Sequence, residues 1–277
     1  VGINVTGTAA IPNGQPYRAI YTLDNGILIA GASYNLIGGT SASQKNVSSG
    51  NTGSGIRITG AAMRNTVWGN YLGTNSTGTG AVPNLRAMSI TDRSAFNVVG
   101  GTGAGQRNLL SGNANLGIYT QDDTDSNSII GNYIGLGADG LLALGNNSSG
   151  ININGNVDGW TIANNVIASN NGDGLVIPSQ RTVVQGNIIG LAADGITARG
   201  NANSGIYMPG ATFTTVGGTT ASLRNIISAC INYHGIALTG GGNNTIQGNY
   251  VGTDITGTLS RGSNQYGIAV YGASTSN

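Results

Sequence analysis

Short apolar stretches recur along the chain at a nearly constant interval. Each follows a glycine and alternates apolar residues with residues of any kind, as in Gly55-Ile56-Arg57-Ile58. This alternation predicts a β-strand with one buried face. The stretches start 24 to 33 residues apart. The glycines or their equivalents are Gly26, Gly55, Ala87, Gly117, Gly150, Gly174, Gly205, Gly235 and Gly267.

Two further short strands are expected in each repeat, and each is opened by a column of asparagines. The column before the second strand contains Asn35, Asn65, Asn97, Asn127, Asn244 and Asn277, with Trp160, Thr182 and Thr214 at the remaining positions. The column before the third strand contains Asn46, Asn70, Asn108, Asn132, Asn165, Asn187, Asn225 and Asn249. Asparagine tolerates the left-handed backbone of a corner, and its amide bonds to the amide one repeat away. Three strands per repeat therefore predict a triangular coil with asparagine ladders at its corners.

The repeats carry two alternating kinds of insertion. One precedes the third strand, as in residues 38–46, and the other follows it, as in residues 73–84. The repeat from Gly150 to Gly174 has neither and is 24 residues long. The two kinds of loop are expected to stack in separate rows, each on every second coil. Asp139, Asp194 and Asp254 lie in the second kind of loop, where we expect them to cap turns.

Composition supports a folded, turn-rich chain. Glycine supplies 49 of 277 residues, and 39% of the residues are hydrophobic. Only 8% are charged and the net charge is +1, so nothing attracts nucleic acid or an anionic membrane surface. The single cysteine, Cys230, cannot form an intrachain disulfide, and no apolar run approaches the roughly 20 residues that span a bilayer.

One phrase recurs almost unchanged, in residues 65–73, 127–135, 182–190 and 244–252. With the residues that follow, its last copy reads GNYVGTDITGT, which resembles the repeats of secreted and cell-surface bacterial β-helix proteins. The whole chain resembles the right-handed parallel β-helix of the pectate-lyase-like superfamily. The resemblance implies an all-β, single-stranded solenoid of about nine coils, and an extracellular or cell-surface location. It leaves the activity open, since this fold serves lyases, hydrolases, adhesins and fibres.

We expect residues 1–277 to form one solenoid cut from a longer repeat array. Residues 1–8 align with residues 72–79, so the sequence starts within a coil, and neither end carries a polar cap. Open ends predict self-association, either end to end or side by side.

Acidic residues are concentrated at Asp122, Asp123 and Asp125. Asp92 and Asp158 fall on the neighbouring coils, about 4.8 Å away on either side. Oxygen ligands at this density predict a calcium site. The alternative is a solvated turn rich in aspartate.

Two short segments partly match motifs of the β-helix enzymes that hydrolyse polygalacturonate. Asp122-Asp123 resembles their paired aspartates, and Tyr233-His234-Gly235 resembles half of their glycine-histidine-glycine motif. The segments lie four coils apart, roughly 19 Å, whereas paired catalytic carboxyls lie about 5 to 9.5 Å apart. The sequence therefore predicts no enzymatic activity, and it places His234 in a packed corner.

Tyrosines form two groups. Tyr71, Tyr133 and Tyr250 recur beside the third strand, and Tyr119 and Tyr207 lie on the outer face of the first. They are candidates for stacking on sugar rings or for lateral contact between solenoids. The alternative is that they cover the apolar bases of the loops.

These patterns favour a non-enzymatic extracellular solenoid that contributes to a surface fibre, sheath, stalk or adhesin. The alternative is a protein that binds or processes carbohydrate, with surface glycans as partners. Ice binding is disfavoured, because the best threonine column, with Thr66, Ser128 and Thr245, is interrupted by Leu36 and Val98. No cofactor other than calcium is expected.

Overall fold

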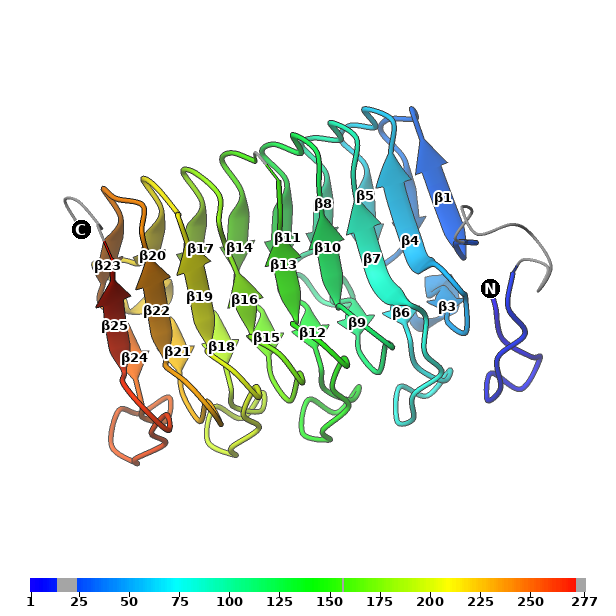
Figure 1. Cartoon of the computed structure of the whole chain (residues 1–277). Coiled ribbons are helices and arrows are strands. Elements are labelled where there is room, and N and C mark those ends of the chain that lie inside the picture. The colour runs from blue at the N-terminus through cyan, green and yellow to red at the C-terminus, as the bar shows by residue number, and fades with distance from the viewer. Residues whose placement is uncertain (14–23, 156, 273–277) are drawn as a thin grey trace.

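The first sheet of the protein is built from nine parallel strands stacked along one axis (Figure 1). The computed structural model describes residues 1–13, 24–155 and 157–272. The strands of this sheet are β1 (Ile27–Ala30), β4 (Ser54–Thr59), β7 (Arg86–Ile90), β10 (Ile118–Thr120), β13 (Ile151–Ile153), β16 (Leu175–Val176), β19 (Ile206–Pro209), β22 (Ile236–Thr239) and β25 (Ile268–Tyr271).

Two further parallel sheets of eight strands complete the coil. The second sheet contains β2 (Leu36–Gly38), β5 (Thr66–Trp68), β8 (Val98–Gly100), β11 (Ser128–Ile130), β14 (Thr161–Ala163), β17 (Val183–Gln185), β20 (Thr215–Gly217) and β23 (Thr245–Gln247). The third contains β3 (Val47–Ser48), β6 (Tyr71–Leu72), β9 (Leu109–Leu110), β12 (Tyr133–Ile134), β15 (Val166–Ile167), β18 (Ile188–Ile189), β21 (Ile226–Ile227) and β24 (Tyr250–Val251). The short 3-10 helices η1 (Ala42–Gln44) and η2 (Ala221–Leu223) lie in the loops of the first kind.

The predicted parallel β-helix with three strands per coil is confirmed. Each strand pairs in parallel with its equivalents in the neighbouring coils, and the coils advance in a right-handed sense (Figure 1). Eight coils carry all three strands, and β25 begins a ninth. Asn277, which was predicted to open the next strand, lies outside the described residues. None of the helices in the described ranges could cross a membrane.

The core is a column of apolar side chains enclosed by the three sheets. In β4, Ile56 and Ile58 point inward and have no exposed surface, while Arg57 between them points outward. Ile56 is in register with Met88 of β7, and Met88 is in register with Ile118 of β10. Burial of these aligned residues favours one register, because a shift by one residue would turn the apolar set outward.

The asparagine columns form the predicted ladders. In the column before the third strand, Asn108 donates its backbone N–H and its side-chain amide to Oδ1 of Asn132, at 3.2 and 2.9 Å. Asn132 donates in the same way to Asn165, at 2.9 and 3.1 Å. The structure adds a third ladder, at the corner before the first sheet, that was not predicted. Its members are Asn51, Asn84, Asn113, Asn146, Asn170 and Asn201.

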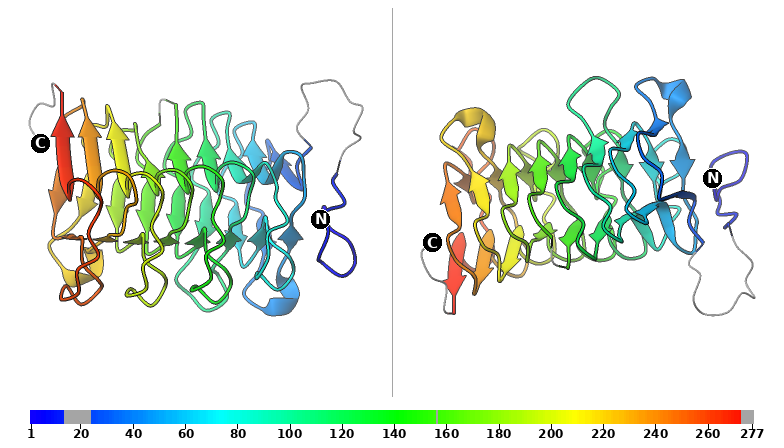
Figure 2. Two further views of the ribbon diagram at one scale, coloured as in Figure 1. Left: turned by 60° about the horizontal axis from the view of Figure 1, so that its bottom comes forward. Right: turned by 90° about the horizontal axis from the view of Figure 1, so that it is seen from above.

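The loops of the second kind stack in one row along an edge of the solenoid (Figure 2). Ala138 donates its backbone N–H to Gly78 of the loop two coils earlier, at 3.0 Å, and Ala193 donates to Gly140 at 2.9 Å. The expected row is therefore confirmed. Capping by aspartate is confirmed as well, since Asp139 Oδ1 accepts the N–H groups of residues 141 and 142, each at 2.9 Å.

All three predicted contact tyrosines beside the third strand have a ring face covered by the protein itself. Tyr133 lies 3.9 Å from the guanidinium of Arg107, measured to the ring centroid. A side chain at Gly140 would meet its ring at 2.9 Å, so the loop backbone presses on that ring too. Lys45 covers Tyr71 and Arg224 covers Tyr250 in the same way, each at 3.8 Å.

Substitution of Arg107 by methionine should lower the free energy of unfolding by about 1 to 2 kcal/mol, because it removes a cation–π contact and a hydrogen bond. The hydrogen bond runs from Arg107 Nε to the carbonyl of Gly131, at 3.1 Å. Urea denaturation measures the loss. The matched control is Arg93→Met, which changes an exposed arginine and should alter the free energy by less than about 0.5 kcal/mol. Equal effects of the two substitutions would show that the contact between Arg107 and Tyr133 does not stabilise the fold.

Candidate functional site

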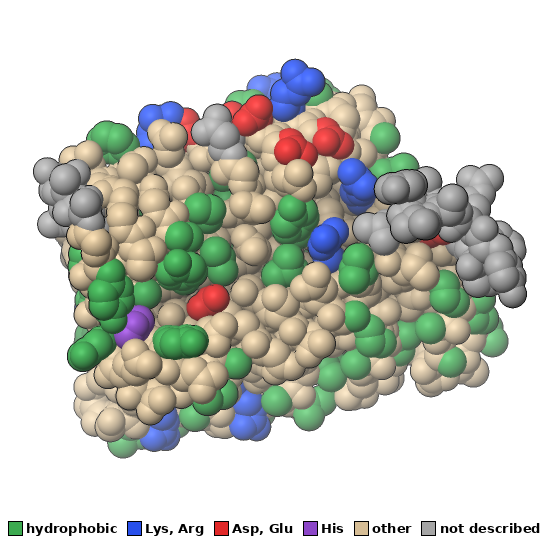
Figure 3. Space-filling model, viewed as in Figure 1, with side chains coloured by type: hydrophobic (Ala, Val, Ile, Leu, Met, Phe, Trp, Pro, Cys, Tyr) green, Lys and Arg blue, Asp and Glu red, His purple; other side chains and the backbone are tan. Residues whose placement is uncertain are grey.

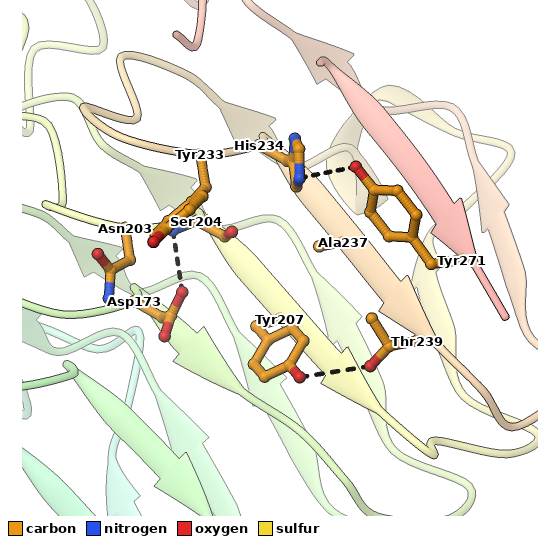
Figure 4. Close-up of a pocket in the computed structure, with 9 residues that line it drawn as sticks. All are labelled: Asp173, Asn203, Ser204, Tyr207, Tyr233, His234, Ala237, Thr239 and Tyr271. Carbon is orange, nitrogen blue, oxygen red and sulfur yellow. Dashed lines mark hydrogen bonds between the residues drawn. The ribbon is translucent and has the colours of Figure 1, made fainter. Parts of the chain in front are cut away.

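A cavity of about 320 Å³ lies on the outer face of the first sheet, toward the C-terminal end of the described chain. Figure 3 shows this face, where charged side chains are few. Figure 4 shows the residues that line the cavity. They are Asp173, Asn203, Ser204, Tyr207, Tyr233, His234, Ala237, Thr239 and Tyr271.

The chemistry of this cavity comes from a column of residues that each precede the first glycine of a repeat. Asp173 precedes Gly174, Ser204 precedes Gly205, and His234 precedes Gly235. The parallel register of β16, β19 and β22 places them on successive coils. Asp173 and His234 are therefore two coils apart, or about 10 Å along the axis.

His234 is held by aromatic neighbours and by a hydrogen bond at each ring nitrogen. Its side chain is 7% exposed, and its ring stacks on Tyr266 with centroids 5.5 Å apart. The backbone N–H of Tyr266 points at Nδ1, at 3.4 Å, and Nε2 lies 3.1 Å from Oη of Tyr271. Because a backbone N–H can only donate, Nδ1 is the acceptor. The proton of the neutral ring is then on Nε2, directed at the Tyr271 oxygen.

Asp173 supplies the carboxylate. Its Oδ1 accepts the backbone N–H of Ser204 at 2.9 Å, and its own N–H donates to Ser149 Oγ at 3.2 Å. Burial raises the pKa of Asp173, although the Ser204 N–H acts in the opposite direction. No arginine or lysine among the described residues forms an ion pair with it. A carboxyl group with a raised pKa is suited to proton transfer nearer neutral pH.

The tyrosines add aromatic faces and hydroxyl groups. Tyr207, predicted as a sugar contact, lines the cavity, and its Oη accepts a hydrogen bond from Thr239 Oγ1 at 3.3 Å. Tyr233 is 47% exposed at the same cavity. A polar ligand with apolar faces, such as a sugar ring, would find both hydrogen-bonding groups and ring surfaces here.

The predicted calcium site receives no support from the geometry. Asp122 and Asp123 both adopt left-handed backbone, with φ of 65° and 53°. Asp125 Oδ1 accepts the backbone N–H of Asp158 at 2.9 Å, and the Asp158 carboxylate is paired with Arg181. Within the described ranges, no three acidic, histidine or cysteine side chains gather as metal ligands would. The arrangement is that of a turn stabilised by its own polar groups.

Sequence reasoning missed the site at Asp173 and His234. His234 was compared with a known motif, with the distant Asp122 pair and with Cys230 as a metal ligand, and never with Asp173. The usable signal was the column that precedes each first-strand glycine, where aspartate, serine, histidine and tyrosine follow one another at residues 173, 204, 234 and 266. Read across coils, that column places a carboxylate, an imidazole and a phenol on one face.

No family model and no curated protein matches the chain. Among solved structures, a point mutant of the periplasmic alginate epimerase AlgG superposes with a TM-score of 0.50 at 13% identity, over 89% of this chain and 48% of that one. The unmutated epimerase matches with a TM-score of 0.47, also at 13% identity, over 90% of this chain and 48% of that one. An alginate lyase from Paenibacillus sp. str. FPU-7 matches at 12% identity with a TM-score of 0.31, over 90% of this chain and 91% of that one.

The match at a TM-score of 0.50 agrees with the fold seen here, a parallel β-helix. The chain spans about half the length of the epimerase structures. The prediction that the chain is not an enzyme is contradicted by the match at a TM-score of 0.50, since that solved protein is an epimerase by name. That prediction depended on a search for one set of hydrolase motifs, which did not include Asp173 or Tyr271.

Proposed function

We propose that this protein binds a polysaccharide along the outer face of the first sheet and processes it by acid–base chemistry in the Asp173–His234 cavity. The observation that carries the proposal is the pair formed by His234 Nε2 and Tyr271 Oη, 3.1 Å apart, which lines the same cavity as Asp173. The fold shared with an alginate epimerase supports a polysaccharide as the substrate class.

The pair suits proton transfer to or from a sugar. The Nε2–H of neutral His234 donates to the Tyr271 oxygen and fixes its position. Tyr271 can then give its phenolic proton to the substrate while the ionised carboxylate of Asp173 takes one from it, and His234 positions the Tyr271 oxygen. Asp173 lies two coils from His234 and lines the same cavity, so it is the second group able to exchange a proton with the substrate.

Tyr207 and Tyr233 are proposed to hold the sugar. Their rings and hydroxyl groups line the cavity between the two proton-transfer groups. Figure 4 shows Tyr207 bonded to Thr239, a contact that restrains the ring before a ligand arrives.

The location follows from the same comparison. The epimerase is named as periplasmic, and we infer that this chain also acts outside the cytoplasm. The predicted rod or adhesin role has no supporting observation in the described residues or in the comparisons, and the enzymatic reading replaces it. Self-association and a calcium requirement stay untested predictions.

Proton NMR in D₂O tests the proposal. Alginate, polygalacturonate and dextran would each be incubated with the protein. Abstraction of a sugar proton exchanges it for deuterium, and cleavage creates new chain-end signals, so both types of reaction are visible. We expect at least one polysaccharide to change. If none changes and none binds at millimolar concentration, the proposal is wrong.

The matched variants for this assay are Asp173→Asn and Asp194→Asn. Asp194 caps a loop on another edge of the coil, where it accepts backbone N–H groups, so its loss should leave turnover unchanged. Loss of the Asp173 carboxylate should lower turnover by about 100-fold or more. Wild-type turnover should rise with pH through the raised pKa of Asp173, because the base must be ionised, and this rise should be absent from Asp173→Asn. Equal turnover of both variants would remove Asp173 from the mechanism.

A further inference from the structure

A second cavity, of about 180 Å³, lies on the same outer face toward the N-terminal end. Its lining differs in character from that of the first cavity, because it contains Arg57 of β4, Arg86 of β7 and Tyr119 of β10. Basic side chains are visible on this half of the face in Figure 3. Nothing in the proposed chemistry of the Asp173–His234 cavity uses these residues.

The two arginines stand close together on adjacent coils, where their like charges repel. Arg57 is partly neutralised, since its guanidinium lies 3.7 Å from the carboxylate of Asp92 and donates to Thr91 Oγ1 at 3.3 Å. Arg86 has no carboxylate partner among the described residues. Its guanidinium instead lies over the Tyr119 ring, 4.5 Å from the centroid.

Arg86 is also incompletely solvated. Burial lowers the pKa of Arg86; Tyr119 acts in the opposite direction, and the charge of Arg57 lowers it further. The Nε atoms of both arginines are buried and have no hydrogen-bond partner within the described part of the chain. A guanidinium in this state gains more free energy from binding an anion than a fully hydrated surface arginine does.

We propose that the Arg57–Arg86 cavity binds a carboxylate of the polysaccharide, so that the substrate is an acidic glycan. The planar fork of a guanidinium matches the two oxygens of a carboxylate. The Tyr119 ring holds the Arg86 fork from one side. Tyr119 Oη also donates to Gln121 Oε1 at 2.6 Å, which restrains the ring. This inference rests on the proposed function and names the substrate class for it.

The spacing of the two cavities adds a requirement on length. Arg86 and His234 each precede the first glycine, or its equivalent, of their coils, and these coils are five apart. The separation is about 24 Å along the axis. A single sugar cannot reach both cavities, so the second cavity contributes only to the binding of an oligosaccharide of several units.

Calorimetric titration of the whole chain with two hexasaccharides tests the inference. One is an alginate hexamer, and the other is the same hexamer with its carboxyl groups reduced to alcohols. Wild type should bind the acidic hexamer more tightly. Arg86→Gln should weaken that binding by about tenfold, because it removes charge-assisted hydrogen bonds. The variant should bind the neutral hexamer as wild type does.

Arg93→Gln is the matched control, because Arg93 is exposed and lies outside the cavity. Arg57→Gln is a second test of the site, and thermal melting of each variant checks that it is folded. If both hexamers bind equally and Arg86→Gln changes neither affinity, the carboxylate site is wrong while polysaccharide binding stands. If neither hexamer binds wild type, this inference fails, whereas the proposed function is decided by its own assay with three polysaccharides.

Discussion

Replacing His234 by phenylalanine is expected to lower turnover of the polysaccharide by about 100- to 10,000-fold, because the proton donor Tyr271 loses the group that positions its oxygen. Phenylalanine keeps an aromatic ring beside Tyr266, but it cannot accept the N–H of Tyr266 or donate to the oxygen of Tyr271, the two contacts that His234 makes. The loss would therefore report on the position of the Tyr271 oxygen and less on packing.

Single-turnover rates and substrate affinity, measured separately, test this expectation. The affinity should change little, because the substrate is held by other side chains of the cavity. Asp194→Asn is the control, since Asp194 caps a loop on another edge of the coil, outside the cavity. Turnover of His234→Phe within about threefold of wild type would show that the His234–Tyr271 pair is structural.

Replacing Asn132 by alanine is expected to lower the free energy of unfolding by about 3 to 5 kcal/mol, a large effect for one substitution. Asn132 has no exposed surface. Its Oδ1 accepts two hydrogen bonds from Asn108, and its amide group donates to Asn165 and to the carbonyls of Val99 and Ile130. Alanine would leave the buried Asn108 donors without an acceptor.

Urea denaturation followed by circular dichroism measures this loss. Hydrogen exchange would show whether the neighbouring coils open first, because each coil contacts only its neighbours. The control is Asn171→Ala, which removes an exposed asparagine bonded to Asn147 at 3.0 Å and should cost less than about 0.5 kcal/mol. A cost below about 1 kcal/mol at Asn132 would mean that the ladder contributes little to stability.

The fold could be predicted because each coil repeats the same arrangement of inward apolar residues and corner asparagines. An inward residue such as Ile56 must match Met88 of the next coil, and a corner such as Asn108 must match Asn132. Such requirements recur at one interval in the sequence. The third ladder was missed although its residues are also asparagines, because variable loops precede them; Asn84, for example, ends the insertion of residues 73–84.

The candidate site could not be predicted in the same way, because it breaks the repeat. Asp173 and His234 are 61 residues apart in sequence, and the coil alone brings them within reach of one ligand. Neither residue type recurs in its column, so periodicity gives no signal there. Tyr119 was predicted only as a possible sugar or lateral contact, and no role was predicted for Arg86. Only the structure shows that the Arg86 guanidinium lies over the Tyr119 ring.

The cations that cover the tyrosines beside the third strand also limit how the number of coils in the solenoid can change. Lys45 of the first coil covers Tyr71 of the second, and Arg107 of the third covers Tyr133 of the fourth. The loop of one even-numbered coil bonds to that of the next, as Ala138 does to Gly78. Where the fifth coil has Asn164 in place of the cation, the sixth has Ile188 in place of the tyrosine. Gain or loss of a single coil would place a cation beside a coil that lacks the tyrosine, and it would break the row of loops. The solenoid is therefore expected to gain or lose coils in pairs.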